Sequence, residues 1–209
     1  MSGSTTKKTR FHTARGERLP VREFPGMATA FIRRLSRQFQ EGPWIAPRAV
    51  TFIERRLDDD SVVLELGAGR STPWFAKRAG RVVSFESDDV WAERVYLQTA
   101  CVRPRVEVRR IPAPSFDNAA LSAFSEQSVD VLFVDQLEIN PGDRVESIRR
   151  LWSLVRPGGI IVLDDSDRPA YASAFTALKG WPCHRFVGMK STPFQATETV
   201  IFTRPLETS

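Results

Sequence analysis

From Ser61 onward the chain alternates short apolar runs with longer amphipathic segments, and this order constrains the fold more than any other feature. The apolar runs are SVVLELG (61–67), RVVSFES (81–87), RVEVRRI (105–111), VDVLFVD (129–135) and GGIIVLDD (158–165). Helical patterns lie between them at 71–80, 88–101, 118–127 and 142–159. Nearly continuous Val, Ile and Leu in strands that alternate with helices predicts an α/β fold. Its sheet is doubly wound and mostly parallel, with helices on both faces.

The two ends of the chain extend this core. The fifth strand is followed by a helical segment (171–180) and two further strands (183–190 and 197–205). The sequence of these two strands favours an antiparallel pair at a sheet edge. The complete sheet is therefore predicted to have seven strands, including an antiparallel edge strand. Two amphipathic helices (27–41 and 47–57) precede the first strand. We expect three regions: a flexible basic N-terminal arm (1–20), an N-terminal helical cover (21–60) and the α/β domain (61–209).

The first strand ends in the turn ELGAGRST, which holds two glycines, and ligands of doubly wound sheets bind at such strand ends. A glycine pair alone is also compatible with a bare structural turn. Thr72 suits the cap of the following helix, with Pro73 in its first turn. Trp74, Phe75 and Trp91 are interpreted as packing residues rather than ligand contacts.

Two acids near this turn bear on the choice of ligand. Glu65 ends the first strand, where a bound pyrophosphate would be repelled, and Thr72 occupies the third glycine position of a dinucleotide fingerprint. Both features argue against NAD, and Glu65 suits a ligand with a cationic amino group. Glu86 ends the second strand, where a carboxylate can accept both hydroxyls of a ribose. Asp88 or Asp89 would then cap the next helix.

Taken together, these segments resemble the class I S-adenosylmethionine-dependent methyltransferases over roughly residues 44–203. ELGAGRS is similar to their acid-x-Gly-x-Gly-x-Gly motif with Ser71 in the last position, and Glu86 matches the acid that binds ribose. VDVLFVD and LVRPGGIIVLDD match the fourth and fifth strands of that family. The resemblance implies S-adenosylmethionine as cofactor, an antiparallel seventh strand in 197–205, and cofactor contacts from Glu65, Gly67, Ala68, Gly69, Ser71, Thr72, Glu86, Ser87 and Asp135.

Three further acids, Asp135, Asp164 and Asp165, follow the fourth and fifth strands. Clustered carboxylates suggest either a site for a hard cation or a general base with a shifted pKa. The spacing resembles the Mg²⁺-dependent catechol O-methyltransferases, which implies Asp135, Asp164 and Asp165 as metal ligands. However, Asp165 stands where that group has Asn, and the lysine expected after the first acid is absent. A metal-free alternative has Asp135 or Asp164 as the catalytic base. Asp165 and Asp167 are also compatible with helix caps.

Charge and composition add little about partners. The net charge is +5, but residues 1–40 hold nine of the 30 basic residues and only two of the 25 acidic ones. A polar basic arm is typical of a disordered tail, and contact with RNA through residues 1–20 is the sharper alternative. Cys101 and Cys183 suggest neither a disulfide framework nor a zinc site. With no apolar run of membrane length and no secretory signal pattern, we expect a cytoplasmic protein.

The sequence therefore predicts a methyltransferase that modifies a hydroxyl of a small molecule of the sugar or secondary-metabolite type. No Asn-Pro-Pro-Tyr motif, typical of amino-group methyltransferases, follows the fourth strand. Two alternatives remain open: an RNA methyltransferase that uses the basic arm, and a non-catalytic module that binds S-adenosylmethionine. The sequence indicates neither the acceptor nor the oligomeric state.

Overall fold

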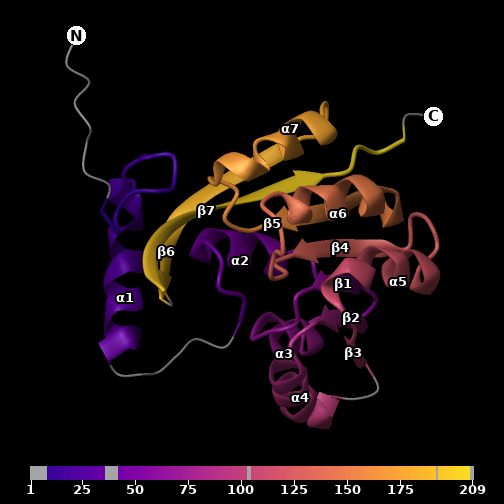
Figure 1. Ribbon diagram of the computed structural model, residues 1–209. Helices are drawn as coiled ribbons and strands as arrows, with labels where there is room; N and C mark the ends of the chain where they lie inside the picture. The colour runs from indigo at the N-terminus through magenta and orange to yellow at the C-terminus, as the bar shows by residue number, and fades with distance from the viewer. Residues whose placement is uncertain (1–8, 36–41, 103–104, 192, 208–209) are drawn as a thin grey trace.

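The computed structural model describes residues 9–35, 42–102, 105–191 and 193–207. Its centre is a seven-stranded sheet in the order β3-β2-β1-β4-β5-β7-β6 (Figure 1). The strands are β1 (Val62–Leu66), β2 (Arg81–Glu86), β3 (Val106–Arg110), β4 (Val129–Val134), β5 (Val155–Leu163), β6 (Cys183–Ser191) and β7 (Phe194–Thr203). The first five strands pair in parallel, whereas β7 runs antiparallel to both β5 and β6. The predicted fold class is thus confirmed, and the antiparallel strand β7 lies just inside the edge strand β6.

Helices flank the sheet on both faces. The α-helices are α1 (Phe24–Leu35), α2 (Pro47–Glu54), α3 (Ser71–Ala76), α4 (Asp89–Gln98), α5 (Phe116–Ala123), α6 (Asp143–Leu151) and α7 (Ser173–Ala177). Short 3₁₀ turns are η1 (Val21–Glu23), η2 (Ala100–Val102), η3 (Ala113–Ser115), η4 (Trp152–Leu154) and η5 (Pro169–Tyr171). Among the described residues, no helix is long and apolar enough to cross a membrane.

The apolar core lies in two layers, one on each face of the sheet. One layer packs the buried sides of α5, α6 and α7 against the strands. The other packs α2 and α3, including the completely buried Ile53 and Phe75, against the opposite face. Burial on both faces of most of β1 and β4 and of the second half of β5 explains why these segments are largely apolar without alternation.

The N-terminal helices differ from the expected pattern. α1 packs against β6 through a small cluster that includes Ala30 and Met189, and residues 36–41 of the expected helix lie outside the described residues. Phe31, Ile32 and Leu35, which the periodicity predicts as the packing face, are instead 49–69% exposed. Figure 1 shows the reason: α1 stands beside the outer end of β6 and away from the main layers. α2 packs against the sheet as expected.

The described part of the predicted basic arm makes defined contacts. Residues 9–20 form a small hairpin, in which His12 and Arg18 make a bridge, and Thr13 and Leu19 are buried. The hairpin joins the antiparallel end of the sheet, where the Ala196 N–H donates to the Arg10 carbonyl at 2.8 Å. The sequence pattern of a disordered tail therefore does not describe residues 9–20, and residues 1–8 lie outside the described residues.

The fifth strand also starts earlier than its sequence suggests. The pattern predicts a helix over 142–159, whereas α6 ends at Leu151 and β5 begins at Val155. β5 continues through Pro157, Gly158 and Gly159, and its register with β4 shifts between Val129 and Val131. The irregularity accommodates residues that disfavour a regular strand.

Candidate functional site

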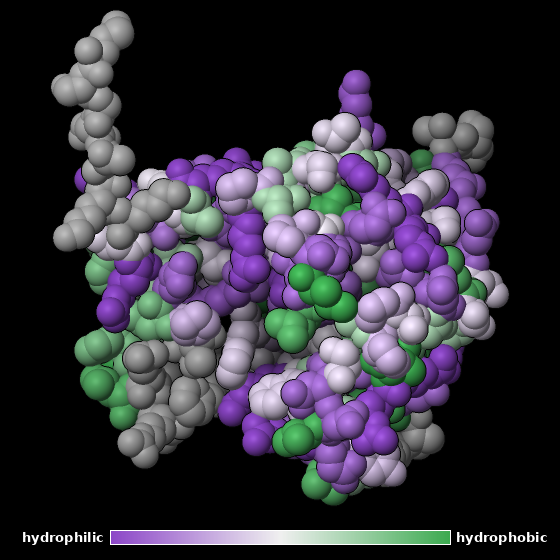
Figure 2. Space-filling model, in the orientation of Figure 1, coloured by the Kyte–Doolittle hydropathy of each residue, from purple (hydrophilic) through white to green (hydrophobic). Residues whose placement is uncertain are grey.

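A cavity of about 550 Å³ opens at the carboxyl ends of β1, β2 and β4. Its volume lies within the range of about 300–1,000 Å³ that is typical of small-molecule sites. Six of the predicted cofactor contacts line it: Gly67, Ala68, Gly69, Ser71, Glu86 and Asp135. Figure 2 shows a hollow above the part of the molecule that carries α3 and α4. The structure thus brings residues from three strand ends into one ligand-sized space.

The glycine turn is compressed between neighbouring strands. Gly67 has φ +92°, and a Cβ added there would lie 2.7 Å from the Gln136 Cα and 2.8 Å from the Asp135 carbonyl oxygen. The Gly67 N–H donates to the Phe85 carbonyl at 2.9 Å. A residue with a side chain would have to adopt a strained backbone and displace the end of β4. Gly67 is therefore required by packing as well as by the turn.

Glu65 has a different place from the one its motif suggests. It is completely buried beneath the turn, where its carboxylate accepts hydrogen bonds from the hydroxyls of Ser71, Ser84 and Thr72, the last at 2.6 Å. Burial raises the pKa of Glu65 to about 7, against the lowering effect of these three hydroxyls. Neither Glu65 nor Thr72 lines the cavity. Glu65 supports the turn from below instead of facing a ligand amino group.

Thr72 is not the N-cap of α3, although the sequence predicts that role. The helix begins at Ser71, so Thr72 lies in its first turn instead of preceding it. The Thr72 hydroxyl accepts from the Gly69 N–H at 3.0 Å and donates to Glu65. Thr72 therefore links the glycine turn to the buried acid beneath it.

Glu86 ends β2 at the wall of the cavity and is 8% exposed. One of its oxygens, Oε1, accepts from the backbone N–H groups of Ser87 at 2.7 Å and Asp88 at 2.8 Å. Burial raises the pKa of Glu86, whereas these two backbone donors oppose the rise. Both backbone donors bind Oε1, and the Ser87 side chain makes a smaller contribution, so Oε2 keeps acceptor capacity for a ligand. Ser87 orients Glu86 through its backbone and does not itself line the cavity.

Asp88 caps α4, which is one of the two predicted alternatives, Asp88 or Asp89. Its side chain accepts from the Trp91 N–H at 2.7 Å. Trp91 lines the cavity, whereas Trp74 and Phe75 are buried in the core as predicted. Sequence reasoning placed Trp91 with the packing residues because helical spacing does not reveal which face of α4 borders a cavity.

The cavity contains further residues that sequence reasoning did not single out. These are Trp44, Arg70, Val90, Leu137 and Arg144. The Arg70 guanidinium lies 5.4 Å from the centre of the Trp44 ring. Trp44 precedes α2 and reaches the cavity only through the fold, so no local pattern could have identified it.

Asp135 follows β4 and faces the cavity with about a third of its side chain exposed. Arg144 from α6 binds it, with 3.0 Å between Nη2 and Asp135 Oδ1. The same guanidinium donates to the carbonyl oxygens of Gln136 at 2.9 Å and Asp164 at 3.3 Å. Burial lowers the pKa of Arg144, but Asp135 and its other anionic neighbours produce a net rise. Arg144 therefore holds the ends of β4 and β5 together.

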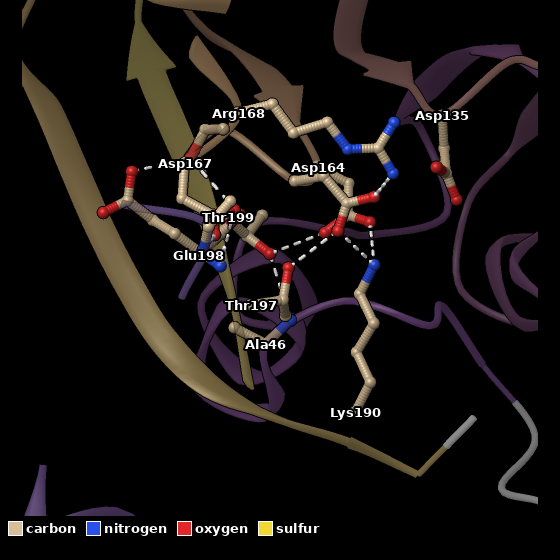
Figure 3. Close-up of polar contacts among 12 residues, drawn as sticks. Ala46, Asp135, Asp164, Asp167, Arg168, Lys190, Thr197, Glu198 and Thr199 are labelled. Carbon is tan, nitrogen blue, oxygen red and sulfur yellow. Dashed lines mark hydrogen bonds and ion pairs between the residues drawn. The ribbon is translucent and has the colours of Figure 1, made fainter. Parts of the chain in front are cut away.

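Asp164 meets a lysine from a distant strand (Figure 3), and the same lysine binds Asp165. Lys190, near the end of β6, donates to Asp164 and to Asp165 Oδ1 at 2.7 Å. Burial lowers the pKa of Lys190, but the two carboxylates raise it well above its ordinary value. Burial raises the pKa of Asp164 against the effect of Lys190, whereas Lys190 and Arg168 overcome burial and lower the pKa of Asp165 to about 2.

The predicted capping role of Asp165 and Asp167 is not what the structure shows. Asp165 has φ +54° and binds Lys190, Arg168 and the hydroxyl of Thr197. Asp167 instead accepts from the backbone N–H of Ala14 in the N-terminal hairpin. Both carboxylates therefore stabilise tertiary contacts around the loop after β5.

The predicted metal ligands do not fit Mg²⁺. Among the described residues, no group of three or more His, Cys, Asp or Glu side chains could hold a metal ion. Asp164 is only 1% exposed, and its two oxygens accept from Thr199 and Lys190. Mg²⁺ requires nearly octahedral oxygen coordination, and an ammonium within hydrogen-bonding distance of the same oxygens would repel it. The expectation of a metal at Asp135, Asp164 and Asp165 therefore conflicts with the geometry.

Comparison with known proteins accords with this site. A family model described as a methyltransferase domain matches residues 64–166, which include the glycine turn, Glu86 and the acids after β4 and β5. No curated protein sequence matches the chain significantly. With its fold and site, the chain therefore contains a class I S-adenosylmethionine-dependent methyltransferase domain. It is therefore an enzyme of this class, with S-adenosylmethionine as its cofactor.

Solved structures share the fold at low sequence identity. An O-methyltransferase from Bacillus cereus in complex with SAH superposes with a TM-score of 0.63 at 17% identity, covering 86% of this chain and 90% of that one. The O-methyltransferase TomG from Streptomyces achromogenes, involved in tomaymycin synthesis, gives 0.57 at 20% identity, with coverages of 90% and 82%. An rRNA methylase from Streptococcus thermophilus gives 0.57 at 14% identity, with coverages of 75% and 93%.

Proposed function

We propose that the chain transfers the methyl group of S-adenosylmethionine to a hydroxyl of a small molecule. The observation that carries this proposal is that the glycine turn, Glu86 and Asp135 share one cavity. Gly67 and Gly69 allow the backbone to approach the methionine part of the cofactor. Oε2 of Glu86, which neither backbone donor binds, would accept from the ribose hydroxyls, and Trp91 offers a ring surface near the adenine.

Asp135 is the better candidate for the proton acceptor. In the transfer, the acceptor oxygen attacks the methyl carbon, and the carbon–sulfur bond breaks with its electron pair moving to sulfur. S-adenosylhomocysteine forms, and the hydroxyl proton passes to a carboxylate. Asp135 reaches the cavity, and only its Oδ1 is bound by Arg144. Asp164 is almost completely buried with both oxygens already bonded, so it fits an anchoring role.

Two observations support a small hydroxyl compound as the acceptor. Two of the similar structures are named as O-methyltransferases. We extend this activity to the chain as part of the proposal. A second cavity, of about 520 Å³, lies between α1, α2, α3 and the end of β6, and Trp44 borders both cavities. We therefore place the body of the acceptor in the second cavity, with its hydroxyl directed toward Asp135.

Calorimetry with S-adenosylmethionine tests the cofactor assignment. We expect the wild-type protein to bind S-adenosylmethionine and not NAD. Glu86→Ala should weaken binding at least tenfold, about 1.4 kcal/mol, because the ribose loses its carboxylate partner. Glu93→Ala, on the exposed side of α4, is the matched control and should bind like wild type. Failure of the wild type to bind S-adenosylmethionine, or tighter binding of NAD, would exclude the proposed function.

Methyl transfer itself is measured as the release of S-adenosylhomocysteine during incubation with a panel of small hydroxyl compounds. Once an acceptor is found, Asp135→Asn should lower kcat by about 100-fold or more, because the amide cannot take the hydroxyl proton. Asp60→Asn, an exposed change in the turn before β1, controls for general effects of the substitution. An unchanged rate for Asp135→Asn would remove the base assignment. Turnover with RNA and with no small molecule would favour the RNA alternative.

A further inference from the structure

Lys190 occupies an unusual position for a basic residue. Only 10% of its side chain is exposed, yet it makes contact with two carboxylates from the loop after β5. It reaches them because β6 and β7 pair without interruption from Cys183 with Phe202 to Ser191 with Phe194. This long hairpin carries the end of β6 to the carboxyl end of β5. Figure 3 shows Lys190 extending from the strand toward Asp164.

The hydrogen bonds around Lys190 leave no carboxylate oxygen of Asp164 or Asp165 without a partner. Asp164 Oδ1 accepts from Thr199 at 3.0 Å, and Oδ2 accepts from Lys190. Asp165 Oδ1 accepts from Lys190 at 2.7 Å and from Thr197 at 2.8 Å, whereas Oδ2 accepts from Arg168. A divalent cation could bind here only by displacing these donors.

The charges in this region are also balanced without a metal. Lys190 and Arg168 face Asp164 and Asp165, and Arg144 faces Asp135. A divalent ion would add two positive charges within hydrogen-bonding distance of the Lys190 ammonium. Because that ammonium is buried, solvent would screen the repulsion between the two cations only weakly. The site therefore already contains the positive charge that carboxylate clusters otherwise recruit from solution.

The ammonium also has capacity for a further contact. It carries three N–H donors, and two of them are accepted by Asp164 and Asp165. No further partner of Lys190 is found among the described residues. Lys190 lines the 520 Å³ cavity in which the acceptor is placed. The third donor can therefore bind an acceptor oxygen that enters from this cavity.

We propose that Lys190 is the resident cation of the acceptor site: it takes the place of a divalent metal beside Asp164 and Asp165 and binds the acceptor oxygen with its remaining N–H. The second part rests on the proposed function. In the transfer, Lys190 keeps all its protons and stabilises negative charge that develops on the attacking oxygen. The proton of the hydroxyl still passes to Asp135, so atoms and charge balance without a metal.

Metal titration tests the proposal without knowledge of the acceptor. Wild type, Lys190→Arg and Lys190→Met are unfolded thermally in EDTA and in about 10 mM MgCl₂, enough to fill a site of millimolar affinity. Wild type and Lys190→Arg should show the same Tm in both solutions. Lys190→Met should have a lower Tm in EDTA and should regain stability in MgCl₂, because the unpaired carboxylates can then bind the metal.

Two outcomes would overturn the proposal. One is Mg²⁺ binding by the wild type, seen as a rise in Tm and as heat in calorimetry with MgCl₂ alone. The other is a folded Lys190→Met protein that shows no response to Mg²⁺. If Lys190→Met does not fold, the wild type and Lys190→Gln, which retains hydrogen-bonding groups, still decide the question by the same titration. Calorimetry with S-adenosylmethionine on the same samples separates failure of the proposed function from failure of this inference.

Discussion

At the scale of single residues, the role of Glu65 is set by the groups that surround its carboxylate. Its carboxylate lies completely buried among three hydroxyls and supports the turn that borders the cavity. Burial raises its pKa from an ordinary value of 4.5 to about 7. Because the folded protein holds this proton more tightly than the unfolded chain does, the stability that Glu65 contributes is complete below about pH 4.5 and is lost as the pH rises through 7.

We therefore expect the free energy of unfolding to depend on pH through Glu65. Between about pH 4 and pH 8, wild type should lose about 3 kcal/mol relative to Glu65→Gln, which has no proton to release. Urea unfolding at a series of pH values measures the difference. Glu126→Gln, the same change at an exposed position, should follow the wild-type curve. Parallel curves for wild type and Glu65→Gln would show that folding does not shift the pKa of Glu65.

At the scale of elements, the turn between β1 and α3 is constrained by β4 as well as by its own residues. Asp135 donates its backbone N–H to the Leu66 carbonyl at 3.0 Å, which holds the end of β4 against the turn. Gly67 fills the narrow space between them with a positive φ. The position of Asp135 in the cavity therefore depends on the absence of a side chain at Gly67.

The two glycines of the turn should consequently respond differently to the same substitution. Gly67→Ala should lower the free energy of unfolding by about 2 kcal/mol or more, because a Cβ there meets backbone at 2.7–2.8 Å and the φ is unfavourable. Gly69→Ala should cost about 1 kcal/mol or less, since its Cβ would meet its nearest neighbours at 3.7 Å. Denaturant unfolding of both variants measures the contrast. Equal losses would contradict this account of the turn.

At the scale of the whole molecule, the N-terminal hairpin completes the loop that follows β5. Arg15 donates to the Ser166 carbonyl at 2.7 Å and lies 3.3 Å from the carboxylate of Glu198, which is completely buried in β7. The backbone of Ala14 donates to Asp167 in the same loop. A segment at one end of the chain thus holds residues next to Asp164 and Asp165. This use of Arg15 is structural and does not require RNA.

Arg15→Ala should therefore destabilise the fold. We expect a loss of about 1–2 kcal/mol, because Glu198 keeps Arg185 but loses one of its two cationic partners. Arg18→Ala, in the same hairpin, should be nearly neutral, since no ion pair of that side chain is found in the described part of the chain. Urea unfolding compares the two. An RNA-binding arm would predict the reverse pattern: unchanged stability, with weaker, salt-dependent binding of single-stranded RNA for both variants.

Local patterns predict a large part of this molecule. Apolar patterns predict strands and helices wherever a segment meets the core, as in α2 and the first four strands. It fails at α1, whose apolar residues Phe31, Ile32 and Leu35 are exposed because the helix meets only the edge of the sheet. It also fails at Trp91, because spacing along a helix does not reveal whether the neighbouring space is core or cavity.

The sequence by itself determined the doubly wound sheet, the class of enzyme and the acids at the strand ends, because these follow from short-range order along the chain. Only the tertiary structure decided what those acids do. It buried Glu65 beneath the turn, paired Asp135 with Arg144, and brought Lys190 from β6 to Asp164 and Asp165. Such pairings depend on strand order and on the long β6–β7 hairpin, which join residues that no local pattern connects. Charge balance at the site is therefore a property of the fold.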